Sequence, residues 1–115
     1  MPKPATRPYS RYTQTALELF GQSIRAERIA GRMTAEQVAQ RVGISRALLR
    51  RIETGDPGCT IGVAFEVAAI VGVPLFTDDP AALNALQKVS GEKLALMPKA
   101  IRQPRKAVKI GRAHV

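Results

Sequence analysis

The segment 35–54 holds a short apolar pattern on each side of Gly43, and it limits the possible folds more than any other part of the chain. Apolar side chains recur there at helical spacing, at Val38, Val42, Ile44, Leu49 and Ile52. Two helices this short cannot bury much surface against each other. Gly43 suits the tight turn between them, because a Cβ would resist a positive φ. Further helices must pack on both to close a core.

The rest of the chain continues this helical pattern, and no stretch shows a convincing strand alternation. The expected helices run from Thr13 or Thr15 to about Ala30, from Ala35 to Val42, from Arg46 to Glu53, from Ile61 to Val71 and from Asp78 to about Val89. Thr34, Ser45 and Thr60 are the expected N-caps of the middle three, because a hydroxyl there accepts a hydrogen bond from a backbone N–H. The sequence therefore predicts an all-α fold with five helices.

Prolines and glycines predict how the chain is divided. Residues 1–12 contain three prolines and no apolar period, so we expect a flexible basic arm there. Ser90-Gly91 is expected to end the fifth helix. Residues 13–90 would then form one domain, and residues 91–115 a basic tail.

Basic residues give the 115-residue chain a formal net charge of +9 at pH 7. Residues 91–115 carry seven Lys or Arg against Glu92, whereas residues 56–90 are acidic. Such an excess points to a polyanionic partner such as nucleic acid. The alternative is that basic tails keep the protein soluble or bind nucleic acid without specificity.

The sequence offers little for catalysis or metal binding. One Cys, Cys59, and one His, His114, exclude an intrachain disulfide and a Cys/His zinc site built from one chain. No nucleophile–base pair and no P-loop supports an enzyme. The apolar run from Val67 to Phe76 is too short to cross a bilayer, and the N-terminal residues lack the apolar stretch of a secretory signal. We therefore expect a cytoplasmic, non-enzymatic protein without cofactor or metal.

The two central helices fit a helix-turn-helix whose motif spans residues 35–54. Ala39 is small where the two helices would cross closely, and Gly43 takes the turn. Four side chains lie off the apolar stripe of the third helix: Arg46, Ala47, Arg50 and Arg51. Any amphipathic helix has a solvated polar face, but here the apolar positions, the small residue, the glycine and the arginine-rich face agree. We interpret this face as one that lies in the major groove of DNA.

The stretch from Ile24 to Phe76 resembles the Cro/C1-type (XRE) helix-turn-helix family. The matching residues are IRAER, MTAEQVAQRVGISRALLRRIETGDPG and EVAAIVGVPLF. The resemblance implies a five-helix, lambda-repressor-like DNA-binding domain. It also implies that a homodimer binds a palindromic operator in double-stranded DNA.

The same resemblance assigns roles to individual residues. Base contacts of the third helix map to Ser45, Arg46, Ala47, Arg50 and Arg51, and phosphate contacts at the start of the second helix map to Thr34 and Ala35. Ala35 stands where this family often has a side-chain donor, so only backbone N–H groups can hold phosphate at that position. A frequent Arg–Glu pair of the family maps to Arg28 and Glu53. We favour a buried pair here over an ordinary surface ion pair.

A narrower resemblance covers most of the chain. Its matching residues are GISRALLRRIETGDPGCTIGVAFEVAAIVGVPLF, followed by LALMPKAIRQPRKAV, and they are similar to HipB-like antitoxins that accompany HipA-type kinases. It implies a repressor that autoregulates its operon and holds a HipA-like kinase toxin. The segment Leu94–Val108 is expected to contact that toxin or a second copy, because it begins with an apolar patch. An XRE regulator without a toxin partner is the alternative.

Residues 110–115 have a separate interpretation. They read Ile-Gly-Arg-Ala-His-Val, which is what ATC-GGA-AGA-GCA-CAC-GTC, a common sequencing-adapter sequence, encodes. We interpret residues 110–115 as an assembly artefact, and a natural tail without function is the alternative. Under either interpretation His114 has no role.

Overall fold

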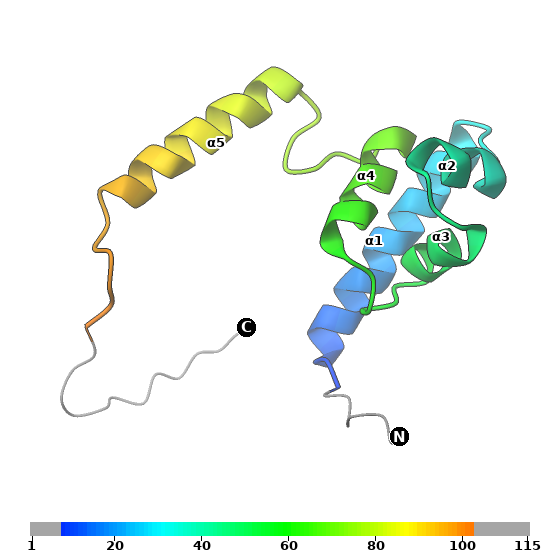
Figure 1. The fold of residues 1–115 in the computed structure, drawn as a ribbon, viewed down its shortest axis with the longest axis horizontal. Coiled ribbons are helices and arrows are strands. Elements are labelled where there is room, and N and C mark those ends of the chain that lie inside the picture. The colour runs from blue at the N-terminus through cyan, green and yellow to red at the C-terminus, as the bar shows by residue number, and fades with distance from the viewer. Residues whose placement is uncertain (1–7, 103–115) are drawn as a thin grey trace. The chain divides into compact units, whose positions relative to one another are not determined.

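The computed structural model describes residues 8–102 and shows helices joined by short loops over that range (Figure 1). The helices are α1 (Arg11–Ala30), α2 (Ala35–Val42), α3 (Arg46–Glu53), α4 (Ile61–Val71) and α5 (Pro80–Ala95). Within the described range, β pairing is limited to an isolated antiparallel bridge between Leu75 and Thr77. The predicted all-α fold with five helices is therefore confirmed for these residues.

The bounds of α2, α3 and α4 agree with the prediction, because local signals define the ends of these helices. The Thr34 hydroxyl accepts a hydrogen bond from the Gln37 N–H at 3.0 Å, and the Gln37 side chain accepts one from the Thr34 N–H at 2.9 Å. The Ser45 hydroxyl accepts from the Leu48 N–H at the start of α3. Gly43 ends α2 with a φ of 84°, the left-handed conformation that the predicted turn requires.

Two expectations about helix ends were wrong, and a third was right in position only. α1 begins earlier than predicted, because the Ser10 hydroxyl accepts a hydrogen bond from the Thr13 N–H and caps the helix. Thr60 stands at the N-cap of α4, but its side chain makes no capping hydrogen bond. α5 continues through Gly91 to Ala95, since one glycine costs a helix only about 1 kcal/mol and good helix formers surround it.

The two ends of the chain differ from the expected arm and tail where the structure describes them. Arg11 belongs to the first turn of α1, and residues 91–95 belong to α5. Residues 1–7 and 103–115 lie outside the described residues. The interpretation of residues 110–115 as an artefact therefore lies outside them as well.

Helices α1–α4 form one unit, and their apolar faces meet in a small core (Figure 1). The buried apolar residues are Ile24 of α1, Val38 and Ala39 of α2, Leu49 and Ile52 of α3, and Val67, Ala68 and Val71 of α4. Val42 and Ile44 are half-buried and pack against this core. Since α2 and α3 both contact a longer helix as well as each other, their apolar faces are covered as the sequence requires.

Gly21 allows α1 to lie directly against the end of α3. A Cβ on Gly21 would lie 2.5 Å from the Ile52 carbonyl oxygen and closer still to that of Glu53. Real Cβ atoms do not approach backbone oxygens so closely, so this position requires a residue without a side chain. Gly21 was not predicted, because a helical pattern does not show which backbone will pass next to it.

α5 belongs to a second unit, residues 79–115, so the expected 13–90 domain contains residues of both units. No α5 residue is buried. Large apolar side chains are exposed along the helix, at Leu83, Leu86, Val89 and Leu94. Among residues 8–102, the structure contains no helix long and apolar enough to cross a membrane.

We predict that Gly21→Ala lowers the free energy of unfolding by about 1–3 kcal/mol, because the added methyl group forces the end of α3 away from α1. Thermal unfolding followed by circular dichroism measures the change. Gly62→Ala is the matched control, since nothing lies within 4 Å of the corresponding Cβ on α4. Its stability should be unchanged or slightly higher. Equal stabilities of the two variants would contradict the close contact.

Candidate nucleic-acid interface

α3 presents a basic surface on the side away from the core. Leu49 and Ile52 of this helix are buried. The side chains predicted to lie off its apolar stripe are all exposed: Arg46, Ala47, Arg50 and Arg51. Ser45, the N-cap of the same helix, is also exposed. The structure therefore brings the five predicted base-contacting residues together on one accessible helix.

A polar groove connects α3 with the start of α2. Its lining residues are Arg25, Arg28, Ala35, Arg46, Ala47, Leu49, Arg50 and Glu53. The four arginines outnumber the single acid, so the groove carries an excess of positive charge. Ala35 lines the groove, and the exposed Thr34 directly precedes it at the N-cap of α2. The two predicted phosphate-contacting residues therefore lie at the edge of a positively charged groove.

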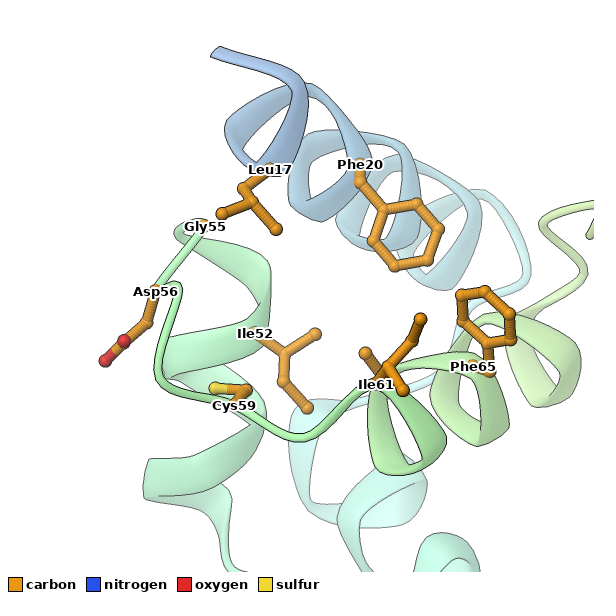
Figure 2. Close-up of a pocket in the computed structure, with 9 residues that line it drawn as sticks. Leu17, Phe20, Ile52, Gly55, Asp56, Cys59, Ile61 and Phe65 are labelled. Atoms are coloured by element: carbon orange, nitrogen blue, oxygen red, sulfur yellow. The ribbon is translucent and has the colours of Figure 1, made fainter. Parts of the chain in front are cut away.

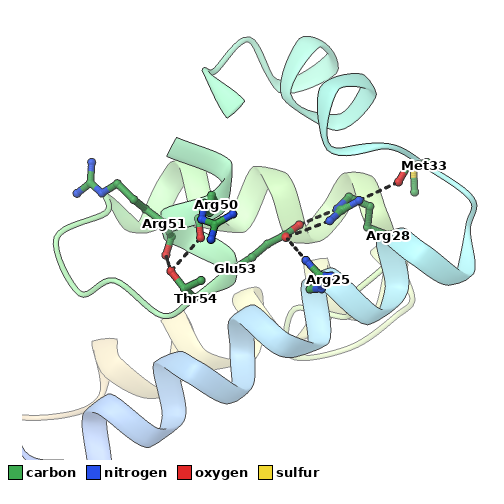
Figure 3. Close-up of polar contacts among 7 residues, drawn as sticks. All are labelled: Arg25, Arg28, Met33, Arg50, Arg51, Glu53 and Thr54. Atoms are coloured by element: carbon green, nitrogen blue, oxygen red, sulfur yellow. Dashed lines mark hydrogen bonds and ion pairs between the residues drawn. The ribbon is translucent and has the colours of Figure 1, made fainter. Parts of the chain in front are cut away.

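A buried ion pair forms one wall of this groove. Arg28 of α1 donates two hydrogen bonds to Glu53 of α3, from Nε to Oε2 at 2.7 Å and from Nη2 to Oε1 at 3.1 Å (Figure 3). Each residue is only 8% exposed, so the pair is of the buried kind. The hydrogen bonds to Glu53 raise the pKa of Arg28 above its usual value, although burial alone would lower it. The guanidinium therefore stays charged inside the fold.

Arg25 approaches the same carboxylate from the solvent side (Figure 3). Its Nη1 lies 3.9 Å from the Glu53 Oε1, and its side chain is 61% exposed. Because Arg28 already compensates the charge of Glu53, Arg25 adds positive charge to the rim of the groove. Arg25 was not predicted as a site residue, although its position three residues before Arg28 puts both on one face of α1.

Arg51 has a different environment from the arginines that line the groove. Its Nε donates to the Oδ2 of Asp56 at 2.8 Å, in the loop that follows α3. Figure 3 shows the Arg51 side chain extending away from the Arg28–Glu53 pair. The bond from Arg51 and a second from the Gly58 N–H lower the pKa of Asp56 below its usual range. The sequence analysis did not identify Asp56 as part of the site.

A second polar groove lies at the turn between α1 and α2. It is lined by Arg32, Met33, Gln37, Gln40 and Arg41, which include two cations and no acid. This groove was not predicted either, because its residues come from the end of a helix, a turn and the outer face of α2. It extends the basic surface along the outside of α2.

An apolar cavity of about 250 Å³ lies between α1, the loop after α3 and α4 (Figure 2). Its lining residues are Leu17, Phe20, Ile52, Gly55, Asp56, Cys59, Ile61, Ala64 and Phe65. The rings of Phe20 and Phe65 have centroids 6.3 Å apart, and Figure 2 shows the Asp56 carboxylate pointing away from the cavity. Burial raises the pKa of the Cys59 thiol, which keeps it neutral. Within residues 8–102, no group of three or more His, Cys, Asp or Glu side chains could hold a metal ion.

A family model described as a helix-turn-helix domain matches residues 19–79. The chain belongs to this helix-turn-helix domain family. The matched range contains α2, α3, α4 and every residue that lines the groove between α1, α2 and α3. A helix-turn-helix binds DNA through the second helix of its motif, so this domain is a DNA-binding domain. No curated protein and no solved structure matches the chain.

We predict that Arg28→Met lowers the free energy of unfolding by about 3–5 kcal/mol, because it leaves the Glu53 carboxylate buried without its partner. The double variant Arg28→Met/Glu53→Leu should recover most of this loss, since it removes both buried charges. Denaturant unfolding measures all variants. Arg25→Met is the exposed control and should change stability by only about 0–1 kcal/mol. A double variant as unstable as Arg28→Met would show that the pair is not the cause.

Proposed function

We propose that this helix-turn-helix protein is a transcriptional repressor that binds double-stranded DNA at a specific sequence. The observation that carries the proposal is the exposed arginine face of α3 beside a positively charged groove. An Arg guanidinium can donate two parallel hydrogen bonds to O6 and N7 of guanine, which is the commonest specific contact in the major groove. A protein held in this way on a promoter blocks transcription from it.

Contacts to phosphates would orient α3 in the major groove. The backbone N–H groups of Ala35 and Glu36, in the first turn of α2, have no acceptor within the helix, so they can donate to a phosphate near Ala35. The Thr34 oxygen accepts from the Gln37 N–H, which leaves its own O–H free to donate as well. Arg25 and Arg46 line the same groove and add charge attraction. Backbone and hydroxyl donors thus replace the side-chain donor that Ala35 lacks.

We further propose that two copies bind a palindromic operator, with one α3 in each half-site about one helical turn apart. A twofold-symmetric homodimer presents two identical recognition helices, and a palindrome offers two identical half-sites. The exposed apolar side chains of α5 support an assembly, because this helix buries none of them. Such a repressor acts in the cytoplasm, at the nucleoid.

An antitoxin role is a second candidate, and it can coexist with repression. Leu94, Leu96 and Met97 are 64%, 89% and 50% exposed, so the last turn of α5 and the two residues after it present apolar surface suited to a protein partner. The resemblance to the XRE family, and within it to HipB-like antitoxins, favours a HipA-like kinase toxin as that partner. Without a toxin, the same chain would be an XRE regulator whose apolar surface serves its own dimer.

We predict that Arg46→Ala and Arg50→Ala each reduce the preference for the operator over a scrambled duplex. An Arg that contacts a base should cost about 1–3 kcal/mol when removed, whereas an Arg on phosphate weakens all sequences alike and lowers the salt slope by about one unit. Binding titrations at several salt concentrations separate the two effects. Arg41→Ala on the outer face of α2 is the control and should leave the preference unchanged. If neither α3 variant changes the preference, these arginines do not read bases.

We predict that coexpression with a HipA-like protein encoded beside this gene yields a stable complex that weakens when residues 92–115 are removed. The apolar side chains at the end of α5 then lose their contact with the partner. Co-purification and size-exclusion chromatography measure the complex, and DNA binding by the truncated chain is the control for folding. A truncated chain that binds DNA and still holds the toxin equally well would contradict this assignment.

A further inference from the structure

The loop after α3 holds the Arg51 side chain in one orientation. The Asp56 Oδ2 accepts from the Arg51 Nε at 2.8 Å, and the Asp56 Oδ1 accepts from the Gly58 N–H at 2.7 Å. The backbone adds a third link, since the Asp56 N–H donates to the Arg51 carbonyl at 2.9 Å. Both carboxylate oxygens are therefore engaged, so Asp56 itself has little freedom to rotate.

Gly58 leaves room for this arrangement. A Cβ at Gly58 would lie 3.3 Å from the Arg51 Nη2 and 3.2 Å from the Asp56 Oδ1, both closer than ordinary van der Waals contact. A side chain there would press on the guanidinium and the carboxylate together. The loop sequence thus fits an Arg that lies over the loop rather than one that moves freely in solvent.

The held guanidinium keeps the donors that guanine requires. Its Nε is occupied by Asp56, but the two terminal amino groups keep N–H donors, and the side chain is 51% exposed. Those donors have the spacing of guanine O6 and N7. By contrast, Arg46 lies 4.0 Å from Glu36, and both of those side chains are mostly exposed. A side chain already held in place loses less conformational entropy on binding than a free one.

The position of Asp56 is otherwise unfavourable for a DNA-binding surface. A carboxylate directly after the recognition helix would repel the phosphate backbone. Pairing with Arg51 compensates the charge of Asp56 locally. The same contact lets the Asp56 carboxylate orient the Arg51 guanidinium. Asp56 also points away from the apolar cavity that it borders, so its contacts lie on the Arg51 side (Figure 2).

We propose that Arg51 is a guanine-reading side chain of α3 and that Asp56 is the positioning residue that fixes its orientation. The inference rests on the proposed sequence-specific DNA binding. Loss of either residue should weaken the same base preference. Overall affinity should fall when Arg51 is removed and rise when Asp56 is removed. Removing Arg51 removes a cation, and removing Asp56 removes a repelling anion.

In the experiment, the full-length protein first selects its preferred duplex from a randomised pool. The affinity of each variant is then measured for that duplex and for every single-base change of it. Arg51→Ala should lose preference for one guanine by roughly five- to 150-fold. Asp56→Asn and Asp56→Ala should lose preference at that same base while binding duplexes that lack this guanine at least as tightly. The double variant Arg51→Ala/Asp56→Ala should lose no more preference there than Arg51→Ala does.

Two further variants separate positioning from stability and from simple charge. Arg51→Lys keeps the charge but lacks the planar fork, so it should keep the salt dependence and lose the guanine preference. Glu66→Gln removes an exposed carboxylate of α4 and should leave every base preference unchanged. Thermal unfolding verifies that each variant is folded. A merely structural loop ion pair would change the unfolding temperature without changing base preference.

Unchanged base preferences in folded Asp56→Asn and Asp56→Ala would overturn the role of Asp56, and an unchanged guanine preference in Arg51→Ala would overturn that of Arg51. Both outcomes leave sequence-specific binding by the unaltered protein intact. If the unaltered protein binds all duplexes alike, the proposed repressor function itself fails and this inference fails with it.

Discussion

The contact between α1 and the end of α3 fixes the position of α3, the proposed recognition helix. Gly21 lets the two backbones meet, and a few residues later Arg28 extends from α1 to the Glu53 carboxylate. Burying two charges is costly, and the cost is offset only while both hydrogen bonds of the pair are made. Separation of α1 from α3 would leave a buried carboxylate without its partner, so the pair permits one arrangement of these helices.

The same guanidinium connects the two halves of the proposed DNA-binding surface. Its Nη1 donates to the Met33 carbonyl at 3.1 Å, in the turn that leads into α2. One side chain of α1 therefore contacts both the segment that would hold phosphate and the end of the helix that would read bases. Base readout requires side chains within a fraction of an ångström of their partners, and a shared anchor keeps the two segments in register. The buried pair therefore contributes to geometry more than to net stability.

The arginines of α3 differ in their surroundings more than in their exposure. Arg46 and Arg50 line a groove with Arg25, where exposed cations attract phosphates over a distance set by salt. Arg51 lies beside a loop carboxylate that directs it. Cations of the first kind raise overall affinity and the association rate in addition to any base contact that they make. A directed guanidinium contributes to discrimination between bases, because its hydrogen bonds require one arrangement of acceptors.

The sequence by itself determined α2, α3 and α4, because local signals act between residues three or four apart. Hydroxyl caps begin α2 and α3, and a left-handed glycine ends α2 and α4. It also determined that Val38, Leu49 and Ile52 face a core, since apolar spacing depends only on helix geometry. Only the tertiary structure decided that Arg25 and Arg28 both pair with Glu53. It also decided that Asp56 holds Arg51 and that Gly21 must lack a side chain. Each of those facts depends on a group from another helix or loop, whose distance in space the sequence spacing does not encode. The exposed apolar face of α5 has the same cause, because an amphipathic pattern shows which side chains seek burial and not what will cover them.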